Sequence, residues 1–327
     1  MEENNTILVT GGAGYIGSFM VRVLLEKGYK PVVVDNLSRG NREAIEQGVA
    51  FYEGSVGDRE LINKIMEENP FSGVIHFAAF ISMKESMENP KIYFEDNTFQ
   101  TLQFLEILKD VGVKNIIFSS TAGVYGNPER VPIQEDDSKN PTNPYGESKL
   151  MVEKILSWYK DIYGFNYATL RYFNACGALL DGSHGEAHSP ETHIIPIALR
   201  ALLEDKEFSI FGTDYDTPDG TCVRDYIHVL DLATAHILAL EKIRKEGGGH
   251  TYNVGTGKGY SNRDIVKAVE EVSGKTLRTV EKDRRPGDAD ELVADVSRIN
   301  EELGFKPQYS DILTIVQSAW KWHKDRA

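Results

Sequence analysis

The stretch Thr10-Gly11-Gly12-Ala13-Gly14-Tyr15-Ile16-Gly17 directly follows an apolar run at residues 7–9 and opens a helical pattern. Glycines in such a turn can adopt positive φ and let backbone amides approach a diphosphate, which the N-terminus of the next helix then faces. Two glycine spacings fit, Gly12-x-Gly14-x-x-Gly17 and Gly11-x-x-Gly14-x-x-Gly17, so the pattern leaves open which glycine has which role. A strand, a glycine-rich turn and a helix in this order predict a dinucleotide-binding fold.

An acidic residue follows this turn at the distance that a dinucleotide site requires. Asp35 closes the second predicted strand, 18 residues after Gly17, where its carboxylate can accept both hydroxyls of the adenosine ribose. A 2′-phosphate would be repelled there, which favours NAD over NADP, although Arg39 nearby keeps NADP open. The sequence therefore predicts NAD as the cofactor.

Two rhythms divide the chain. Up to residue 175, short β-branched runs alternate with helical patterns, which is typical of a parallel sheet covered by helices. The predicted strands are 7–10, 31–35, 49–52, 73–77, 114–119 and 166–172, and the predicted helices are 15–27, 58–68, 91–110 and 145–163. Beyond residue 175, long loops rich in glycine, proline and histidine separate shorter elements. We expect an α/β protein, with a Rossmann-type doubly wound parallel sheet in residues 1–175 and a smaller substrate-binding lobe in residues 176–327.

The composition excludes several classes of protein. The 50 acidic residues outnumber the 36 basic ones, giving a net charge of −14, which argues against a nucleic-acid partner and means that an anionic ligand must be met by local charges. Only two cysteines occur, which fits a reducing compartment. Residues 1–5 lack a positive charge and no apolar stretch reaches about 18 residues. We expect a cytoplasmic protein that has no membrane segment.

The candidate chemistry lies at the start of the last predicted helix of the first lobe. Tyr145 and Lys149 stand four residues apart and share one helix face, behind an N-cap candidate, Asn143, and a proline at the first helical position. This spacing alone carries little weight. It gains weight because Ser119-Ser120-Thr121 stand at the end of the fifth predicted strand, and ligands of such folds bind at the carboxyl ends of the strands.

A phenol ionises near pH 10 when unperturbed, so Tyr145 would be a poor base at neutral pH. The Lys149 cation and a positive nicotinamide ring both favour the phenolate, so we expect the pKa of Tyr145 to fall. Tyr145 would then remove a hydroxyl proton while the carbon beneath gives hydride to NAD⁺, with Thr121 holding the oxygen. This chemistry is a redox step on a secondary alcohol, and the residues named so far do not identify the alcohol.

Over nearly the whole chain the sequence resembles the extended short-chain dehydrogenase/reductase family, and within it the enzymes that epimerise UDP-hexoses at C4. The motifs that carry this resemblance are residues 11–18, 35–37, 76–79, 119–126, 145–149, 171–174, 217–229 and 284–288. The resemblance implies reversible interconversion of UDP-glucose and UDP-galactose, in which bound NAD⁺ takes hydride from C4 and returns it to the opposite face. It also implies a homodimer formed through helices near 91–110 and 145–163.

The resemblance assigns catalysis to Tyr145, Lys149 and Thr121. The cofactor-binding residues that it implies are Gly11, Gly14, Tyr15, Ile16, Gly17, Asp35, Asn36, Ser55, Val56, Phe77, Ala78, Ala79, Asn97, Ser119, Tyr145, Lys149 and Tyr172. The implied UDP-sugar contacts are Thr121, Tyr145, Asn174, His193, Ile194, Arg224, Arg285, Asp288 and Leu292. Arginines suit this role because planar guanidinium groups fit phosphate oxygens.

Three positions depart from the family pattern. Ser55 stands where an aspartate commonly meets adenine, and Ile81 where a cofactor-contacting lysine is frequent, so NAD retention stays open. Leu292 aligns with the position that limits substituent size at C2 of the sugar. Leucine is intermediate in size, which leaves turnover of UDP-N-acetylglucosamine and UDP-N-acetylgalactosamine open.

Other interpretations remain. His184, His188 and His193 cluster in sequence around Glu186, but they lack a helical i, i+4 frame, so we expect no metal. The family resemblance implies instead that His193 contacts the substrate. A nucleotide-sugar dehydratase would carry Asp-Glu after the threonine, whereas Ala122 follows Thr121. An epimerase of UDP-pentoses or UDP-uronates stays possible on the sequence. A non-enzymatic NAD sensor is disfavoured because the Thr, Tyr and Lys set is intact.

Overall fold

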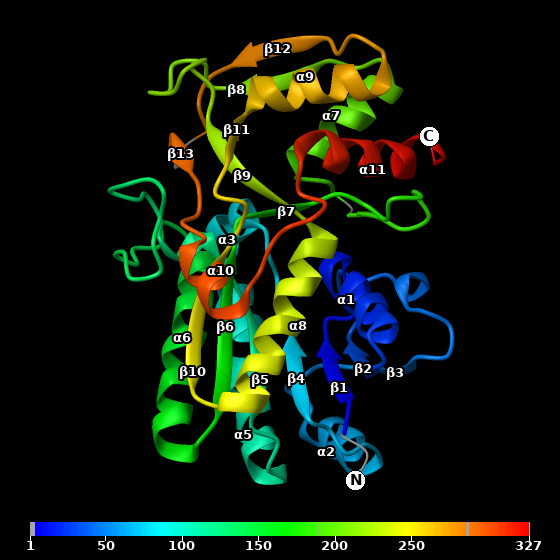
Figure 1. The fold of residues 1–327 in the computed structure, drawn as a ribbon, viewed down its shortest axis with the longest axis vertical. Coiled ribbons are helices and arrows are strands. Elements are labelled where there is room, and N and C mark those ends of the chain that lie inside the picture. Colours follow the sequence, from blue (N-terminus) through cyan, green and yellow to red (C-terminus); the bar gives the residue numbers. More distant parts are fainter. Residues whose placement is uncertain (1–3, 189, 286–287, 327) are drawn as a thin grey trace.

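The computed structural model describes residues 4–188, 190–285 and 288–326, and its largest layer is a seven-stranded, wholly parallel sheet (Figure 1). The strand order is β10-β6-β5-β4-β1-β2-β3. The strands are β1 (Thr6–Thr10), β2 (Lys30–Asp35), β3 (Ala50–Glu53), β4 (Gly73–His76), β5 (Asn115–Thr121), β6 (Asn166–Tyr172) and β10 (Gly249–Val254). This order confirms the predicted doubly wound Rossmann-type sheet.

Both faces of the sheet are buried, because alternate residues of each strand enter different cores. On one face, Val9 and Val33 pack against α1 (Tyr15–Glu26) and α8 (Val229–Glu246). On the other face, Leu8 and Val32 pack against α2 (Arg59–Glu68), α5 (Gln100–Val111) and α6 (Pro144–Tyr163). This burial on both sides accounts for the continuously apolar strand sequences.

Two elements that follow residue 175 belong to this layer. β10 pairs with β6 as the edge strand, and α8 covers the face next to α1. The chain therefore returns to the first lobe after entering the second, and a single division at residues 175 and 176 does not follow the sheet. Sequence rhythm missed this return because β10 lies between glycine-rich segments that are typical of loops.

The predicted helix over 91–110 is a composite. It consists of α4 (Pro90–Ile92), a π-helical segment η2 (Tyr93–Phe99) and α5. The shorter elements nearby are η1 (Arg42–Ala44), α3 (Met83–Glu88) and η3 (Ala122–Val124). Such π-helical segments occur often at functional sites, and η2 carries Asn97, one of the predicted site residues.

The smaller lobe is built on two short sheets and three helices that enclose their own core. β9 (Val223–His228) pairs with β7 (Asn174–Cys176), β11 (Gly259–Ser261) and β13 (Glu291–Leu292), while β8 (Phe208–Phe211) pairs with β12 (Thr279–Lys282). The helices around this core are α7 (Ile194–Leu203), α9 (Asn262–Ser273) and α11 (Ile312–Lys324).

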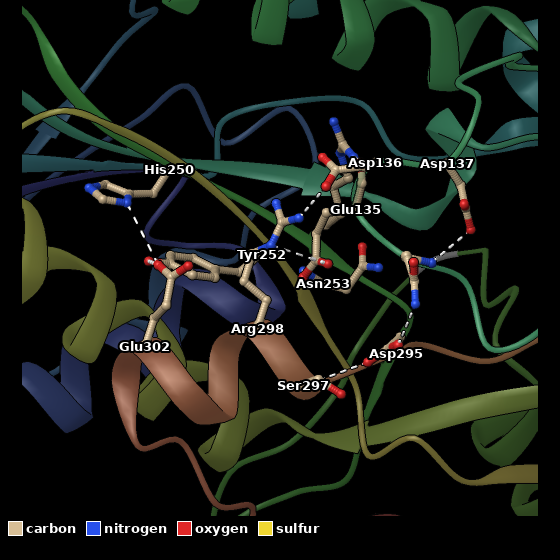
Figure 2. Close-up of polar contacts among 12 residues, drawn as sticks. Glu135, Asp136, Asp137, His250, Tyr252, Asn253, Asp295, Ser297, Arg298 and Glu302 are labelled. Carbon is tan, nitrogen blue, oxygen red and sulfur yellow. Dashed lines mark hydrogen bonds and ion pairs between the residues drawn. The ribbon is translucent and has the colours of Figure 1, made fainter.

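Polar contacts tie the segment between η3 and α6 to later parts of the chain (Figure 2). Glu135 accepts a hydrogen bond from the backbone N–H of Asn253 at 2.9 Å, and Arg298 of α10 (Ser297–Leu303) lies 3.6 Å from it. Backbone bonds from Ile133 to Val293 and from Asp295 to Ile133 continue the attachment. The segment that leads into α6 is therefore held in place by both lobes.

Within the described part of the chain, none of the helices combines the length and the apolar character that crossing a bilayer demands.

Candidate active site

The turn between β1 and α1 shows why it is rich in glycine. Gly11 has φ +69°, and a Cβ there would lie 2.6 Å from the backbone nitrogen of Ala78. A Cβ on Gly17 would collide with the backbone of Gly11, whereas one on Gly14 would meet only the Gly11 oxygen, at 3.3 Å, and otherwise open space. Positions 11 and 17 must therefore be glycine, because a side chain there would collide with the neighbouring backbone. Gly14 leaves open space at the start of α1.

The start of α1 is suited to an anion. Its N-cap is Gly14, and among the described residues no side chain caps the helix and no acid stands in its first turn. The exposed amides and the helix dipole therefore attract negative charge. This open cradle fits the diphosphate of a dinucleotide.

Asp35 lies at the carboxyl end of β2, as predicted. Its carboxylate accepts hydrogen bonds from the backbone of Ala13 at 2.9 Å and of Leu37 at 2.8 Å. Burial raises its pKa, and the two backbone bonds oppose that rise. Arg39, which left NADP open, forms an ion pair with Glu85. The carboxylate and the occupied arginine both favour a ribose with a free 2′-hydroxyl.

Two further segments reach the same edge of the sheet. Phe77, Ala78 and Ala79 follow β4, and Ser55 and Val56 follow β3. The Ser55 hydroxyl donates to the side chain of a glutamine on α5. The residues that line a cavity of about 390 Å³ at this place are Ser55, Gly57, Asp58, Glu95, Phe99, Gln100 and Gln103.

Asn97 is occupied by contacts within the protein. Its side chain exchanges hydrogen bonds of 2.8 and 2.9 Å with the backbone of Phe80, and it donates to Ser148 at 3.1 Å. It therefore fixes the turn after β4 against α6. A direct contact between Asn97 and the cofactor stays a prediction.

The catalytic candidates converge where β5, β6 and α6 meet. α6 begins as predicted, with Asn143 accepting a hydrogen bond from the Gly146 N–H at 2.9 Å and Pro144 at the first helical position. Tyr145 is buried, and the neighbouring Thr121 side chain lowers its pKa. One turn later, Lys149 donates to the carbonyl oxygen of a β5 residue, Ser119, at 2.9 Å. Tyr172 of β6 bonds the Ser119 hydroxyl.

The electrostatics of this group differ from one expectation. The sequence predicts that Lys149 and a bound nicotinamide ring together lower the pKa of Tyr145. In the protein alone, burial raises the pKa of Tyr145 to about 12, and only the Thr121 side chain lowers it. Burial also lowers the pKa of Lys149 to about 7, against an opposing effect of Glu153. A half-neutral lysine attracts a phenolate weakly, so these side chains do not by themselves supply the predicted activation.

Sequence reasoning missed a buried ion pair beneath the site. Glu153 and Arg171 form hydrogen bonds of 2.6 to 3.2 Å, and Ser120 of β5 donates to Glu153 at 2.6 Å. Glu153 follows Lys149 by four residues, so the face that carries positions 145, 149 and 153 was a signal available in the sequence.

The second lobe brings several predicted substrate contacts to the same region. Arg224 of β9 stands in register with Leu292 of β13, and its guanidinium lies 3.7 Å from the carboxylate of Asp288. Leu292 packs with the buried cluster that includes Ala122 and Tyr125. These two residues follow β5, which ends at the candidate Thr121. This packing joins β13 to the catalytic edge.

The other substrate candidates have mixed placements. Asn174 donates to the backbone oxygen of the aspartate after Arg224 at 2.8 Å, and Arg285 stacks at 4.0 Å from the ring centroid of Phe211. Pro286 and Gly287 of the same motif lie outside the described residues. His193 and Ile194 open α7, and the polar contacts of the His193 side chain run to two glutamates, not to Arg224.

Comparison with known proteins identifies the family. A family model described as "NAD dependent epimerase/dehydratase family" matches residues 7–255. A UDP-glucose 4-epimerase of Streptococcus mutans is 49% identical over 97% of this chain and 96% of its own. The solved structure of a UDP-glucose 4-epimerase from Brucella ovis in complex with NAD superposes with a TM-score of 0.94, at 44% identity over 97% of both chains. One from Bifidobacterium longum, in complex with NAD⁺ and UDP, gives a TM-score of 0.92 at 39% identity over 98% of both chains.

The matches cover nearly the whole chain and include structures solved in complex with NAD. They confirm the resemblance drawn from the sequence motifs and the expected cofactor. The chain belongs to the NAD dependent epimerase/dehydratase family.

Proposed function

We propose that this protein is a UDP-glucose 4-epimerase, an isomerase that interconverts UDP-glucose and UDP-galactose through oxidation and reduction at C4. The observation that carries the proposal is the meeting of Tyr145, Thr121 and Lys149 at the edge of the sheet that also holds the glycine-rich turn. The relatives named UDP-glucose 4-epimerase cover nearly the whole chain, which makes the same reaction the best supported one.

The first lobe fits NAD. The open start of α1 would take the diphosphate, and Asp35 would accept hydrogen bonds from the ribose hydroxyls. Ser55 and Val56 would lie toward the adenine, and Phe77, Ala78 and Ala79 along the cofactor. When bound, NAD⁺ supplies an acceptor for the C4 hydride, which it later gives back, and a positive ring charge.

The protein's own groups handle the proton. Tyr145 takes the proton from the 4-hydroxyl as the C4 hydride leaves, and it returns the proton to O4 when hydride is delivered to the opposite face, so the net redox change is zero. Thr121, whose side chain acts on the pKa of Tyr145, would orient the same oxygen. Lys149 lies one helical turn after Tyr145 and donates a hydrogen bond to the Ser119 carbonyl oxygen. From there it would bind hydroxyls of the nicotinamide ribose and adjust the pKa of the Tyr145 phenol.

The second lobe would hold the nucleotide sugar. Arg224 and Arg285 supply guanidinium groups for the diphosphate of a substrate that the acidic protein would otherwise repel. Asn174, His193, Ile194 and Asp288 complete this binding set, and Leu292 limits the space around C2 of the sugar.

The dehydratase alternative lacks support, because the residue after Thr121 is Ala122, which begins η3 and carries no acid for an elimination.

Assembly and location extend this proposal. The outer surface of α6 exposes 65% of Trp158 and 63% of Ile162, and Phe99 at the end of η2 is 55% exposed. Isolated monomers rarely leave so many large apolar side chains on neighbouring helices in water. A second copy of the chain, packed against α5 and α6 to form a four-helix bundle, would cover these exposed side chains. We place this homodimer in the cytoplasm.

The test needs no added cofactor. Purified protein is denatured and the supernatant is assayed for NAD, while native protein receives UDP-galactose alone and is assayed for UDP-glucose. We expect NAD to be released and UDP-glucose to form. Absence of turnover, both without and with added NAD⁺, would refute the proposed reaction.

A further inference from the structure

Four ligand-type side chains meet between the two lobes, outside the catalytic group. Glu186, His188, Glu191 and His193 each offer one atom to a cluster whose atoms all lie within 4.8 Å of one another. His188 Nδ1 is 2.8 Å from the Glu186 carboxylate, and His193 Nδ1 bonds the same oxygen. The Glu191 carboxylate lies 3.4 Å from His193 Nδ1.

Both carboxylates are withdrawn from water. The side chain of Glu186 is 3% exposed and that of Glu191 is 4% exposed. Oε1 of Glu191 accepts hydrogen bonds from the backbone of Thr192 and His193. Its Oε2 is buried and finds no hydrogen-bond partner within the described ranges, and its ion pair with Arg200 is 3.7 Å long. Apart from this long ion pair the buried oxygen is uncompensated, so a cation bound at the cluster would stabilise the Glu191 carboxylate.

The protein builds the cluster from fixed elements. The backbone oxygen of Glu186 accepts a hydrogen bond from Trp322 of α11 at 2.8 Å, and His193 is the N-cap residue of α7. The ring of Tyr15, at the start of α1, packs edge-on against His188 at 6.1 Å between centroids. Three helices from both lobes therefore hold the four side chains in place.

The spacing suits a tetrahedral metal ion. Zinc lies about 2.0–2.2 Å from imidazole nitrogen and carboxylate oxygen, which puts neighbouring ligands of a tetrahedron about 3.4 Å apart. His188 Nδ1 lies 2.8 Å from Glu186, His193 Nδ1 lies 3.4 Å from Glu191, and no two ligand atoms are more than 4.8 Å apart. Small side-chain rotations would therefore bring the four atoms to tetrahedral spacing. The sequence predicts no metal because the ligands lack a helical frame. In the folded protein, the position of His193 as N-cap residue of α7 fixes it beside the other three side chains.

We propose that Glu186, His188, Glu191 and His193 form a site for a borderline divalent cation of the zinc type. Two imidazole nitrogens in a set of four disfavour Mg²⁺ and Ca²⁺, which prefer oxygen. The ion replaces the protons that now join the histidines to Glu186, so binding releases protons. Both rings use Nδ1, which leaves Nε2 of His193 for the substrate contact proposed above. The ion fastens the loop after β7 to α7, beside the start of α1.

The test measures binding and not activity. Chelator-treated protein without a polyhistidine tag is titrated with Zn²⁺ by calorimetry, and its melting temperature is followed. We expect one Zn²⁺ per chain, a rise in Tm of about 3–6 °C at a hundredfold excess over Kd, and no response to Mg²⁺. Co²⁺ in the same site should give the visible spectrum of a tetrahedral complex.

Two variants locate the site. Glu186→Gln and His188→Gln should each weaken Zn²⁺ binding at least tenfold and reduce the rise in Tm to about half or less at the same Zn²⁺ concentration. His188→Gln provides the check if the buried Glu186→Gln protein does not fold, because His188 is the more exposed of the two. His250→Gln is the matched control, since His250 also faces a glutamate, Glu302, at 3.9 Å (Figure 2) and should leave binding unchanged. Absence of stoichiometric binding, or equal binding by His188→Gln and the wild type, would overturn the proposal.

Discussion

The side-chain nitrogen of Lys149 donates a hydrogen bond of 2.9 Å to the carbonyl oxygen of Ser119, inside a site that buries both residues. Burial lowers the pKa of this lysine to about 7, although Glu153 opposes the effect. The folded protein therefore binds fewer protons at this position than the unfolded chain does between about pH 7 and the ordinary lysine value near 10.5.

The stability of the nucleotide-free protein should depend on pH through Lys149. Below pH 7 the buried ammonium is charged and its full cost is present, and the cost is relieved as the pH rises from 7 toward 10.5. The free energy of unfolding of the wild type should thus rise over this range relative to Lys149→Met, by a few kcal/mol in total. Urea unfolding at pH 7, 8 and 9 measures the difference, and parallel curves for the two proteins would contradict the lowered pKa.

Tyr145→Phe should remove the proton-transfer group and retain the ring. We expect kcat to fall by about 10²–10⁴ or more, with UDP binding little changed, because the second lobe supplies the diphosphate contacts. An epimerisation assay and calorimetry with UDP measure the two quantities. Tyr163→Phe, on the exposed end of the same helix, is the control and should keep the wild-type rate. Retention of near-normal turnover by Tyr145→Phe would show that another group moves the proton.

The buried pair of Glu153 and Arg171 should be costly to break on one side. Glu153→Leu leaves the guanidinium of Arg171, a side chain that is only 5% exposed, without its carboxylate partner. We therefore expect a loss of about 3–5 kcal/mol in the free energy of unfolding. The double variant Glu153→Leu/Arg171→Met should lose less than the single variant, because no uncompensated charge remains. Urea denaturation measures both, and additive losses from the two single variants would mean that the pair is not coupled.

Sequence patterns predicted the parts of this protein that depend on local signals. β1, the turn that follows it, Asp35 and the N-cap of α6 are each encoded within a few residues, and the structure has them within one or two residues of the predicted bounds. Ser55, Asn97 and the members of the second lobe were assigned through resemblance, since no local pattern marks them.

Features that depend on distant pairing could not be predicted. β10 joins the main sheet only because β6 offers it a free edge, and the hydrogen bonds of Asn97 go to a turn 17 residues away. The burial that raises the pKa of Tyr145 and lowers that of Lys149 could not be predicted for the same reason. Spacing on a helix places two groups on one face, but the burial of that face depends on the rest of the fold.

Charge placed on the proposed dimer surface should separate the subunits. Trp158→Glu puts a carboxylate at the centre of the exposed apolar face of α6, so we expect monomers in light scattering where the wild type gives dimers. Leu180→Glu is the matched control, because Leu180 is also an exposed apolar residue but lies in the loop after β7. A wild-type monomer, or a dimer that survives Trp158→Glu, would exclude α6 as the interface.

The size of the side chain at Leu292 should set the choice between plain and N-acetylated UDP-hexoses. Leu292 stands in register with Arg224 and packs with the buried cluster that includes Ala122, so we place it between the proposed diphosphate site and the candidate Thr121. Leu292→Gly removes the branched side chain and should raise the rate with UDP-N-acetylglucosamine relative to UDP-galactose, by about 10-fold or more. Leu292→Tyr fills the same space and should lower that ratio while leaving UDP-galactose turnover within a fewfold of the wild type. Parallel assays of both sugars at equal concentration measure the ratio, and one that is unchanged in both variants would place the C2 substituent elsewhere.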